Sequence, residues 1–183
     1  MKDNLESLNN DGGHTVKIDL DYRDMCDEKI AVAESLGASG KLQEALDTLL
    51  VVEKTTRNAS DVVSTGRILV AIVKLCFHAK DWALLNEYIF MLAKKKSQLI
   101  LAFGEMVREC YTFIDQMPDK ETKYKLIECL RIVTEGKVEL DRDQLTLKLI
   151  QIKESEGDVT GAENILQELQ FEAYGCFKTQ EEI

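Results

Sequence analysis

The stretch nearest to a recognisable chemical motif is residues 37–41, Gly-Ala-Ser-Gly-Lys, which suggest a phosphate-binding loop. That loop requires another glycine at position 35, a serine or threonine directly after the lysine, and a preceding β-strand. The chain has Ser35 and Leu42 at these two positions, and the segment follows a predicted helix. We therefore interpret it as a glycine turn that ends a helix.

Metal ligands and activated nucleophiles are not expected either. The two histidines, His14 and His78, have no second His, Cys or carboxylate at ligand spacing. The five cysteines are scattered and form no CxxC, so we expect reduced, mostly buried thiols of an intracellular protein: Cys26, Cys76, Cys110, Cys129 and Cys176. We predict no catalytic residue, no cofactor, no metal and no small-molecule ligand.

Composition narrows the class of partner. The 183 residues carry a formal net charge of −10, which argues against nucleic acid or an anionic membrane as the main partner. The longest apolar run is interrupted by Lys74, and no signal-peptide pattern opens the chain. One proline and ten glycines favour an all-α protein over a sheet protein.

The stretch from Ser60 to Leu92 predicts the central helix pair. Residues 68–77 are apolar on nearly all sides, so their helix should be buried on more than one face. After a break at residues 80–81, apolar side chains recur every three or four residues, whereas Asn86 and Glu87 form a polar back that should face water. A single pair cannot bury the first helix, so further pairs should stack beside it.

Further helices are predicted on both sides of this pair. Two precede it, over residues 24–36 and 41–54. Ser97 could cap a long helix that reaches Met117, and Pro118 should set the first turn of the next helix. A seventh helix and an eighth should flank Gly157, the eighth with a capping box over residues 160–163.

The turns between these helices recur regularly. They begin at Gly40, Lys80, Pro118 and Gly157, a spacing of 40, 38 and 39 residues. This period predicts a right-handed α-solenoid of about four antiparallel helix pairs over residues 23–177. Residues 1–22 should form a disordered acidic arm, either a solvated tail or a contact for a basic partner, and residues 178–183 a polar tail.

Some residues are expected to matter for this architecture or for binding. Trp82, Gly40, Pro118 and Gly157 are predicted structural anchors at the turns. Lys94, Lys95 and Lys96 end a helix, where the macrodipole favours cations, and they are also candidate partner-binding or nuclear-import residues.

Several segments resemble one family closely. They are residues 56–65 (TRNASDVVST), 67–74 (RILVAIVK), 79–87 (AKDWALLNE), 133–138 (VTEGKV), 157–159 (GDV) and 165–170 (ILQELQ). Together they resemble the amino-terminal half of a PCI-family subunit of the 26S proteasome regulatory-particle lid, from about Tyr22 to Gly175. Such subunits also carry a carboxy-terminal winged-helix module, which no segment of this chain resembles, so we expect a fragment that ends at a truncation point.

This resemblance implies a non-catalytic scaffold arm, located in the cytoplasm and the nucleus. Its partners would be other lid subunits, including the lid deubiquitinase, the core-particle ring and the ATPase base. A free-standing peptide-binding adaptor is the alternative, but Arg67, Lys74 and Lys148 do not repeat in register as its binding face would require. An enzyme is a more distant third hypothesis.

Overall fold

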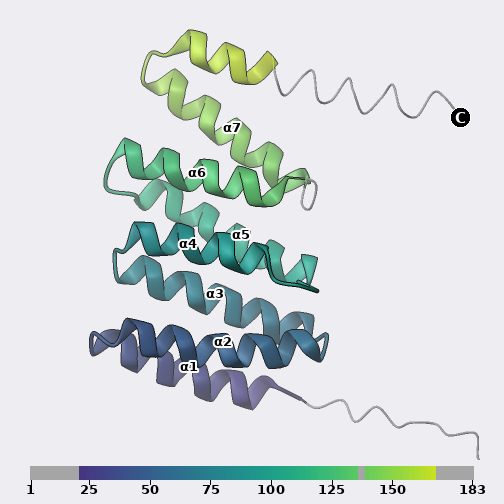
Figure 1. Cartoon of the computed structure of the whole chain (residues 1–183). Coiled ribbons are helices and arrows are strands. Elements are labelled where there is room, and N and C mark those ends of the chain that lie inside the picture. Colours follow the sequence, from purple (N-terminus) through teal and green to yellow (C-terminus); the bar gives the residue numbers. More distant parts are fainter. Residues whose placement is uncertain (1–20, 136–138, 168–183) are drawn as a thin grey trace, which may run out of the picture.

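A computed structural model of the chain describes residues 21–135 and 139–167, and these are helical without any strand (Figure 1). The helices are α1 (Arg23–Ala38), α2 (Leu42–Asn58), α3 (Val62–His78), α4 (Trp82–Ala93), α5 (Ile100–Phe113), η1 (Ile114–Gln116), α6 (Lys120–Thr134) and α7 (Glu139–Ser155). Residues 159–167 are also helical. Nearly all of the predicted acidic arm, and the whole predicted polar tail, lie outside the described residues.

The helices stack in chain order into two layers (Figure 1). Helix α1 contacts α3, α3 contacts α5 and α5 contacts α7, while α4 contacts α6 in the other layer. Consecutive helices also pack together, as in the pairs α1–α2, α2–α3 and α3–α4. This arrangement is a helical repeat, in which each unit is covered mainly by its neighbours. The handedness of the stack and a complete fourth pair stay predictions.

Helix α3 lies at the centre of the packing, as its apolar sequence predicts. It contacts α1, α2, α4 and α5, and Ile68, Leu69 and Ile72 are completely buried. Burying one such side chain stabilises a fold by about 1.5–3 kcal/mol. The prediction that this helix is buried on more than one face is therefore confirmed.

Tight turns of one kind end α1, α2, α3 and α7. In each, the second residue after the helix has a left-handed backbone, with φ between 55° and 79°: Gly40, Ser60, Lys80 and Gly157. The next amide donates to a carbonyl five residues back, as from Asp81 to Cys76 at 3.3 Å and from Asp158 to Lys153 at 2.9 Å. These bonds form the Schellman motif, which satisfies the last carbonyls of a helix.

Aspartates cap the helices that follow most of these turns. The side chains of Asp61, Asp81 and Asp158 accept hydrogen bonds from amides three residues on, at 2.9–3.0 Å. Asp119 does the same at the start of α6, at 2.8 Å. The capping box predicted over residues 160–163 is wrong, because Asp158 supplies the cap two residues earlier.

The segment before α5 also differs from the prediction. Ser97 does not cap the helix, since its own backbone is left-handed with φ 57°. The N-cap of α5 is Leu99, which makes no side-chain cap hydrogen bond. The helix then tightens into η1 instead of reaching Met117 as one α-helix.

Glu87 is exposed as predicted, but Asn86 faces water only in part. It is half-buried, its backbone carbonyl lies 3.7 Å from the Sγ of Cys129 on α6, and its side-chain oxygen Oδ1 is buried without a hydrogen-bond partner. The prediction failed because α6 packs on this side of α4, a contact that the local pattern of α4 cannot reveal.

The predicted anchors lie at or next to turns. Trp82 is half-buried at the start of α4, where its ring lies 5.6 Å from that of Phe77. Pro118 is exposed and precedes the N-cap of α6, so it lies just before the first turn that it was predicted to set. Gly40 and Gly157 take left-handed conformations at φ 79° and 78°. Their structural weight as anchors stays a prediction.

Candidate interaction surfaces

The phosphate-loop resemblance disappears in the structure. Gly37 lies inside α1, and Gly40 forms the turn to α2. Lys41 is the exposed N-cap of α2, and its Nζ lies 4.0 Å from the carboxylate of Glu44. The amide of Lys41 donates to the carbonyl of Leu36 at 2.9 Å, which agrees with the interpretation as a glycine turn.

The four described thiols are buried and free: Cys26, Cys76, Cys110 and Cys129. Burial raises the pKa of Cys76 and of Cys129 to about 12, and it raises the pKa of Cys110 well above its usual range. The thiolate is the reactive form of cysteine, so these side chains are poor nucleophiles at neutral pH. Cys176 lies outside the described residues.

Other reactive groupings do not assemble within the described residues. His78 is exposed at the end of α3, while His14 lies outside the described range. No three His, Cys, Asp or Glu side chains in residues 21–135 and 145–167 gather as ligands for a metal ion. None of the described helices is both long and apolar enough to cross a membrane.

The three cations weighed as peptide-binding residues form ion pairs between helices. Arg67 of α3 pairs with Asp27 of α1. Lys74 of α3 lies 3.5 Å from Glu109 of α5, and Lys148 of α7 lies 2.6 Å from Asp115 of η1. Such partly exposed pairs add little stability individually, but they occupy the cations that a peptide carboxylate would need.

The turn from α4 to α5, residues 94–99, is stabilised in part by a residue that is far away in the sequence. A guanidinium nitrogen of Arg57, near the end of α2, donates to the carbonyl oxygen of Lys96 at 2.5 Å. The side-chain amide of Gln98 donates to the carbonyl of Leu92 at 2.9 Å. Together with the left-handed Ser97, these bonds give the turn one defined conformation.

Arg57 is itself positioned by a buried carboxylate. Its Nε donates to Oε1 of Glu53 at 2.7 Å, and Glu53 is 0% exposed. The other oxygen of Glu53, Oε2, has no hydrogen-bond partner. Removing the arginine would leave a buried charge unpaired, which is strongly unfavourable. The Glu53–Arg57 pair therefore connects the interior of α2 to the turn that presents Lys94, Lys95 and Lys96.

The lysine cluster itself lies at the surface. Lys94 and Lys96 are exposed and Lys95 is half-buried. Within the described part of the chain, none of the three ammonium groups forms an ion pair. Beside Lys95 lies a hollow of about 290 Å³, which Ile100 and Phe103 line from the start of α5.

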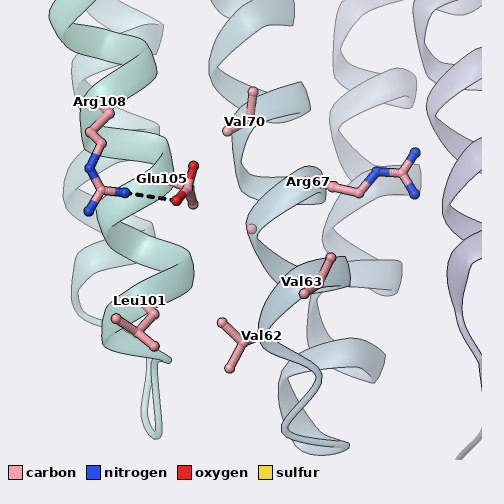
Figure 2. A pocket seen from close by; sticks show the side chains of 8 residues that line it. Val62, Val63, Arg67, Val70, Leu101, Glu105 and Arg108 are labelled. Carbon is pink, nitrogen blue, oxygen red and sulfur yellow. Dashed lines mark hydrogen bonds and ion pairs between the residues drawn. The ribbon is translucent and has the colours of Figure 1, made fainter.

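A second, larger hollow of about 500 Å³ lies between α3 and α5 (Figure 2). Figure 2 shows Val62 and Leu101 facing each other across it, whereas Arg67 points away toward α1. Arg108 and Glu105 form an ion pair of 2.8 Å on the α5 wall. The lining is therefore mainly apolar, and its charges are already paired.

Sequence reasoning found the lysines but missed both the hollows and the pair that holds the turn. One signal was present for the pair. Glu53 continues the apolar stripe of α2 one turn after Leu49, and Arg57 follows one further turn on. A carboxylate on a buried stripe with an arginine four residues later indicates a paired buried charge. The predicted helix ended at Lys54, four residues short of its observed end, and so excluded Arg57.

Comparison with known proteins gives consistent matches. Residues 44–183 match the family described as PSMD12/CSN4, N-terminal. The chain is 40% identical over 169 residues to the 26S proteasome non-ATPase regulatory subunit 12 of Dictyostelium discoideum, covering 91% of this chain and 38% of that protein. It is 44% identical over 150 residues to homolog A of that subunit in Arabidopsis thaliana, covering 81% and 34%.

The 26S proteasome regulatory subunit RPN5 of Saccharomyces cerevisiae is 38% identical over 172 residues, with 92% of this chain and 38% of RPN5 covered. The chain thus spans about a third of the length of the curated relatives it matches. The family match covers most of the chain, including the central helices and the turn that carries the lysines. The chain belongs to the PSMD12/CSN4 N-terminal family, whose proteasomal members are regulatory subunits of the 26S particle.

Proposed function

We propose that this chain forms a non-catalytic scaffold arm of the 26S proteasome regulatory-particle lid. In this role it contributes to lid assembly and to contacts with the core particle, the ATPase base and the lid deubiquitinase during ubiquitin-dependent protein degradation. The observation that carries the proposal is the family match over residues 44–183, together with relatives named as non-ATPase regulatory subunits.

The physical character of the described residues supports a binding role. A helical repeat exposes a large surface relative to its core, which suits contacts with several neighbours at once. The thiols are buried with raised pKa values, and the cations on α3 and α7 are tied to neighbouring helices. The proposal includes a right-handed solenoid of four helix pairs and a location in both cytoplasm and nucleus.

A chimera tests this role directly. In yeast cells depleted of RPN5, the matching segment of RPN5 is replaced by this chain, and lid-containing proteasomes are purified and quantified. We expect the chimera to enter the lid, whereas a chimera with a flexible Gly/Ser segment of equal length should not. If a soluble, folded chimera were absent from purified proteasomes, the scaffold proposal would be wrong.

The same experiment can include the 183-residue chain alone. We expect it to leave lid assembly unrestored, because the resemblance assigns lid-building contacts to a module that these residues do not match. Full recovery with the chain alone would place the assembly determinants in these helices. Assay of the purified chain for ubiquitin hydrolysis tests the enzyme hypothesis, and measurable turnover would contradict the non-catalytic role.

The adaptor hypothesis has less support. Its binding face would need free cations at matched positions on successive helices. Arg67, Lys74 and Lys148 are instead paired with Asp27, Glu109 and Asp115. The cluster at residues 94–96 is the notable exception, and it lies at a turn between helices and not along the face of one.

A further inference from the structure

The charge pattern around the α4–α5 turn is unusual for this protein. Most cations in the described residues lie within 4.0 Å of a carboxylate, as Lys120 and Lys125 do. Six lysines have no described carboxylate within that distance: Lys54, Lys80, Lys94, Lys95, Lys96 and Lys123. Three of them are consecutive, although the chain carries a net charge of −10. The turn is therefore a local region of positive potential on an acidic protein.

Large apolar side chains are exposed next to these lysines. Ile100 and Leu101, in the first turn of α5, are 59% and 68% exposed. Val63, in the first turn of α3, is 69% exposed. Helices α3 and α5 begin at the same edge of the stack (Figure 1). Val63 and Leu101 line the same hollow between these two helices, and Ile100 precedes Leu101 in the chain. Grouped apolar exposure of this kind is typical of a binding surface.

The two hollows lie where the lysine cluster meets the exposed apolar side chains. Lys95 and Ile100 line the hollow of about 290 Å³, while Leu101 lines the hollow of about 500 Å³ together with Val62 and Val63. Because Ile100 and Leu101 are adjacent in the chain, the start of α5 separates the two depressions. A partner side chain could enter either one while its flanking charges reach the lysines.

This surface is also preorganised. Arg57 fixes the carbonyl of Lys96, and Gln98 fixes the carbonyl of Leu92. The start of α5 has no side-chain cap, so its first amides add partial positive charge beside the lysines. A turn that is already ordered loses less conformational entropy when a partner binds.

We infer that the α4–α5 turn, with the start of α5, is a docking site for an acidic segment of a neighbouring protein that carries a large apolar side chain. The acidic groups pair with Lys94, Lys95 and Lys96, and the apolar side chain covers Ile100 and Leu101. This inference rests on the proposed function and specifies one kind of partner segment for the arm.

The overall charge of the chain favours an acidic protein segment over nucleic acid at this site. Nucleic acid would also meet the lysines, but the overall charge of −10 repels a polyanion beyond the immediate cluster. A short acidic segment neutralises only the cluster, and its apolar residue gains from burying the exposed side chains. A second copy of this chain or its own amino-terminal segment would be a different occupant, and the test below separates them.

The test measures peptide binding to the 183-residue chain by fluorescence anisotropy. The probe is a labelled 12-residue peptide of three Glu-Leu-Glu-Glu repeats. Two counterparts replace every glutamate by glutamine or every leucine by serine. We expect the acidic, leucine-containing probe to bind most tightly, with affinity that falls as salt rises. Equal affinity for all three peptides, or no binding by the probe at millimolar concentration, would overturn the inference.

Matched charge reversals locate the site. The variant Lys94→Glu/Lys95→Glu/Lys96→Glu should weaken probe binding about tenfold or more, because attraction becomes repulsion. The control Lys54→Glu/Lys80→Glu/Lys123→Glu changes the net charge equally at separated lysines and should leave the affinity within about twofold. Ile100→Ser should reduce the advantage of the leucine-containing probe over its serine counterpart. An equal loss in both triple variants would reject a local site.

A crosslinking experiment then identifies the natural occupant. A photo-crosslinking residue replaces Ile100 in the chimera, and the joined peptide is identified by mass spectrometry from purified proteasomes. We expect a segment of another subunit rich in Asp and Glu. A crosslink to a neutral or basic segment, to the chain itself or to a second copy would contradict the inference. Because peptide binding needs no assembly, failure of the chimera to assemble remains distinguishable from failure of this surface.

Discussion

Two kinds of helix connection in this chain solve the same problem differently. After α1, α2, α3 and α7, the chain turns within three residues. The last of these three residues donates its amide to a carbonyl of the helix just ended, and it directly precedes the next helix. From α4 to α5 it takes residues 94–99, and the key restraint comes from Arg57, far away in sequence. The tight turns are self-contained, whereas the longer turn depends on the stacked fold.

The tight turns connect successive helices, whereas the α4–α5 turn also offers groups that a partner can bind. A tight turn satisfies its own backbone groups, so it leaves few groups free for a partner. The α4–α5 turn exposes unpaired lysines beside the apolar side chains at the start of α5, yet its shape is fixed by the buried Glu53–Arg57 pair. Changes at the two kinds of turn should therefore have different consequences.

The largest effect is expected at the remote restraint. Arg57→Ala leaves the fully buried Glu53 without its cation, so the free energy of unfolding should fall by about 3–5 kcal/mol. The measurement is urea denaturation, with hydrogen exchange at residues 94–99 as a second readout. Lys125→Ala, at an exposed pair on α6, should cost less than about 1 kcal/mol. Equal losses in the two variants would show that the buried pair has no special role.

An intermediate effect is expected at a tight turn. Asp81→Ala removes the cap that accepts from the amide of Leu84 at 3.0 Å, which should lower the unfolding free energy by about 0.5–2 kcal/mol. Glu87→Ala removes an exposed acid from the same helix and serves as the control. Hydrogen exchange at residues 94–99 should not change, because this turn acts locally. Faster exchange there would contradict the separation of the two turn types.

The smallest effects concern the left-handed residues. Gly40→Ala should destabilise the fold by about 1 kcal/mol, because a side chain disfavours φ 79° although no atom lies within 4 Å of the added carbon. Lys80→Gly should stabilise it by up to about 1 kcal/mol, since φ 55° is strained for lysine. Thermal unfolding of both variants gives the signs, and two losses would indicate that Lys80 contributes contacts of its own.

The sequence predicted what depends on neighbours along the chain. The apolar run at 68–77 predicted the buried α3, and glycine or aspartate at 40, 81 and 157–158 located the tight turns. Long-range packing was beyond such patterns: Asn86 is covered by α6, and Ser97 adopts a left-handed backbone in a turn held by Arg57. The lysines were identified as candidates, but their shared surface with Ile100 and Leu101 depends on how the helices stack.

The rates at which the buried thiols react can report local opening of the helices. At neutral pH, the raised pKa values of Cys76, Cys110 and Cys129 keep them protonated and unreactive while their helices remain closed. Alkylation then requires local opening, so each thiol measures the opening of its own helix. Cys26 lies in α1, which packs mainly against α2 and α3, whereas Cys76 lies in α3, which packs against α1, α2, α4 and α5. Two thiols that are equally inaccessible in the closed protein should therefore differ in lifetime, with the one in α1 consumed first.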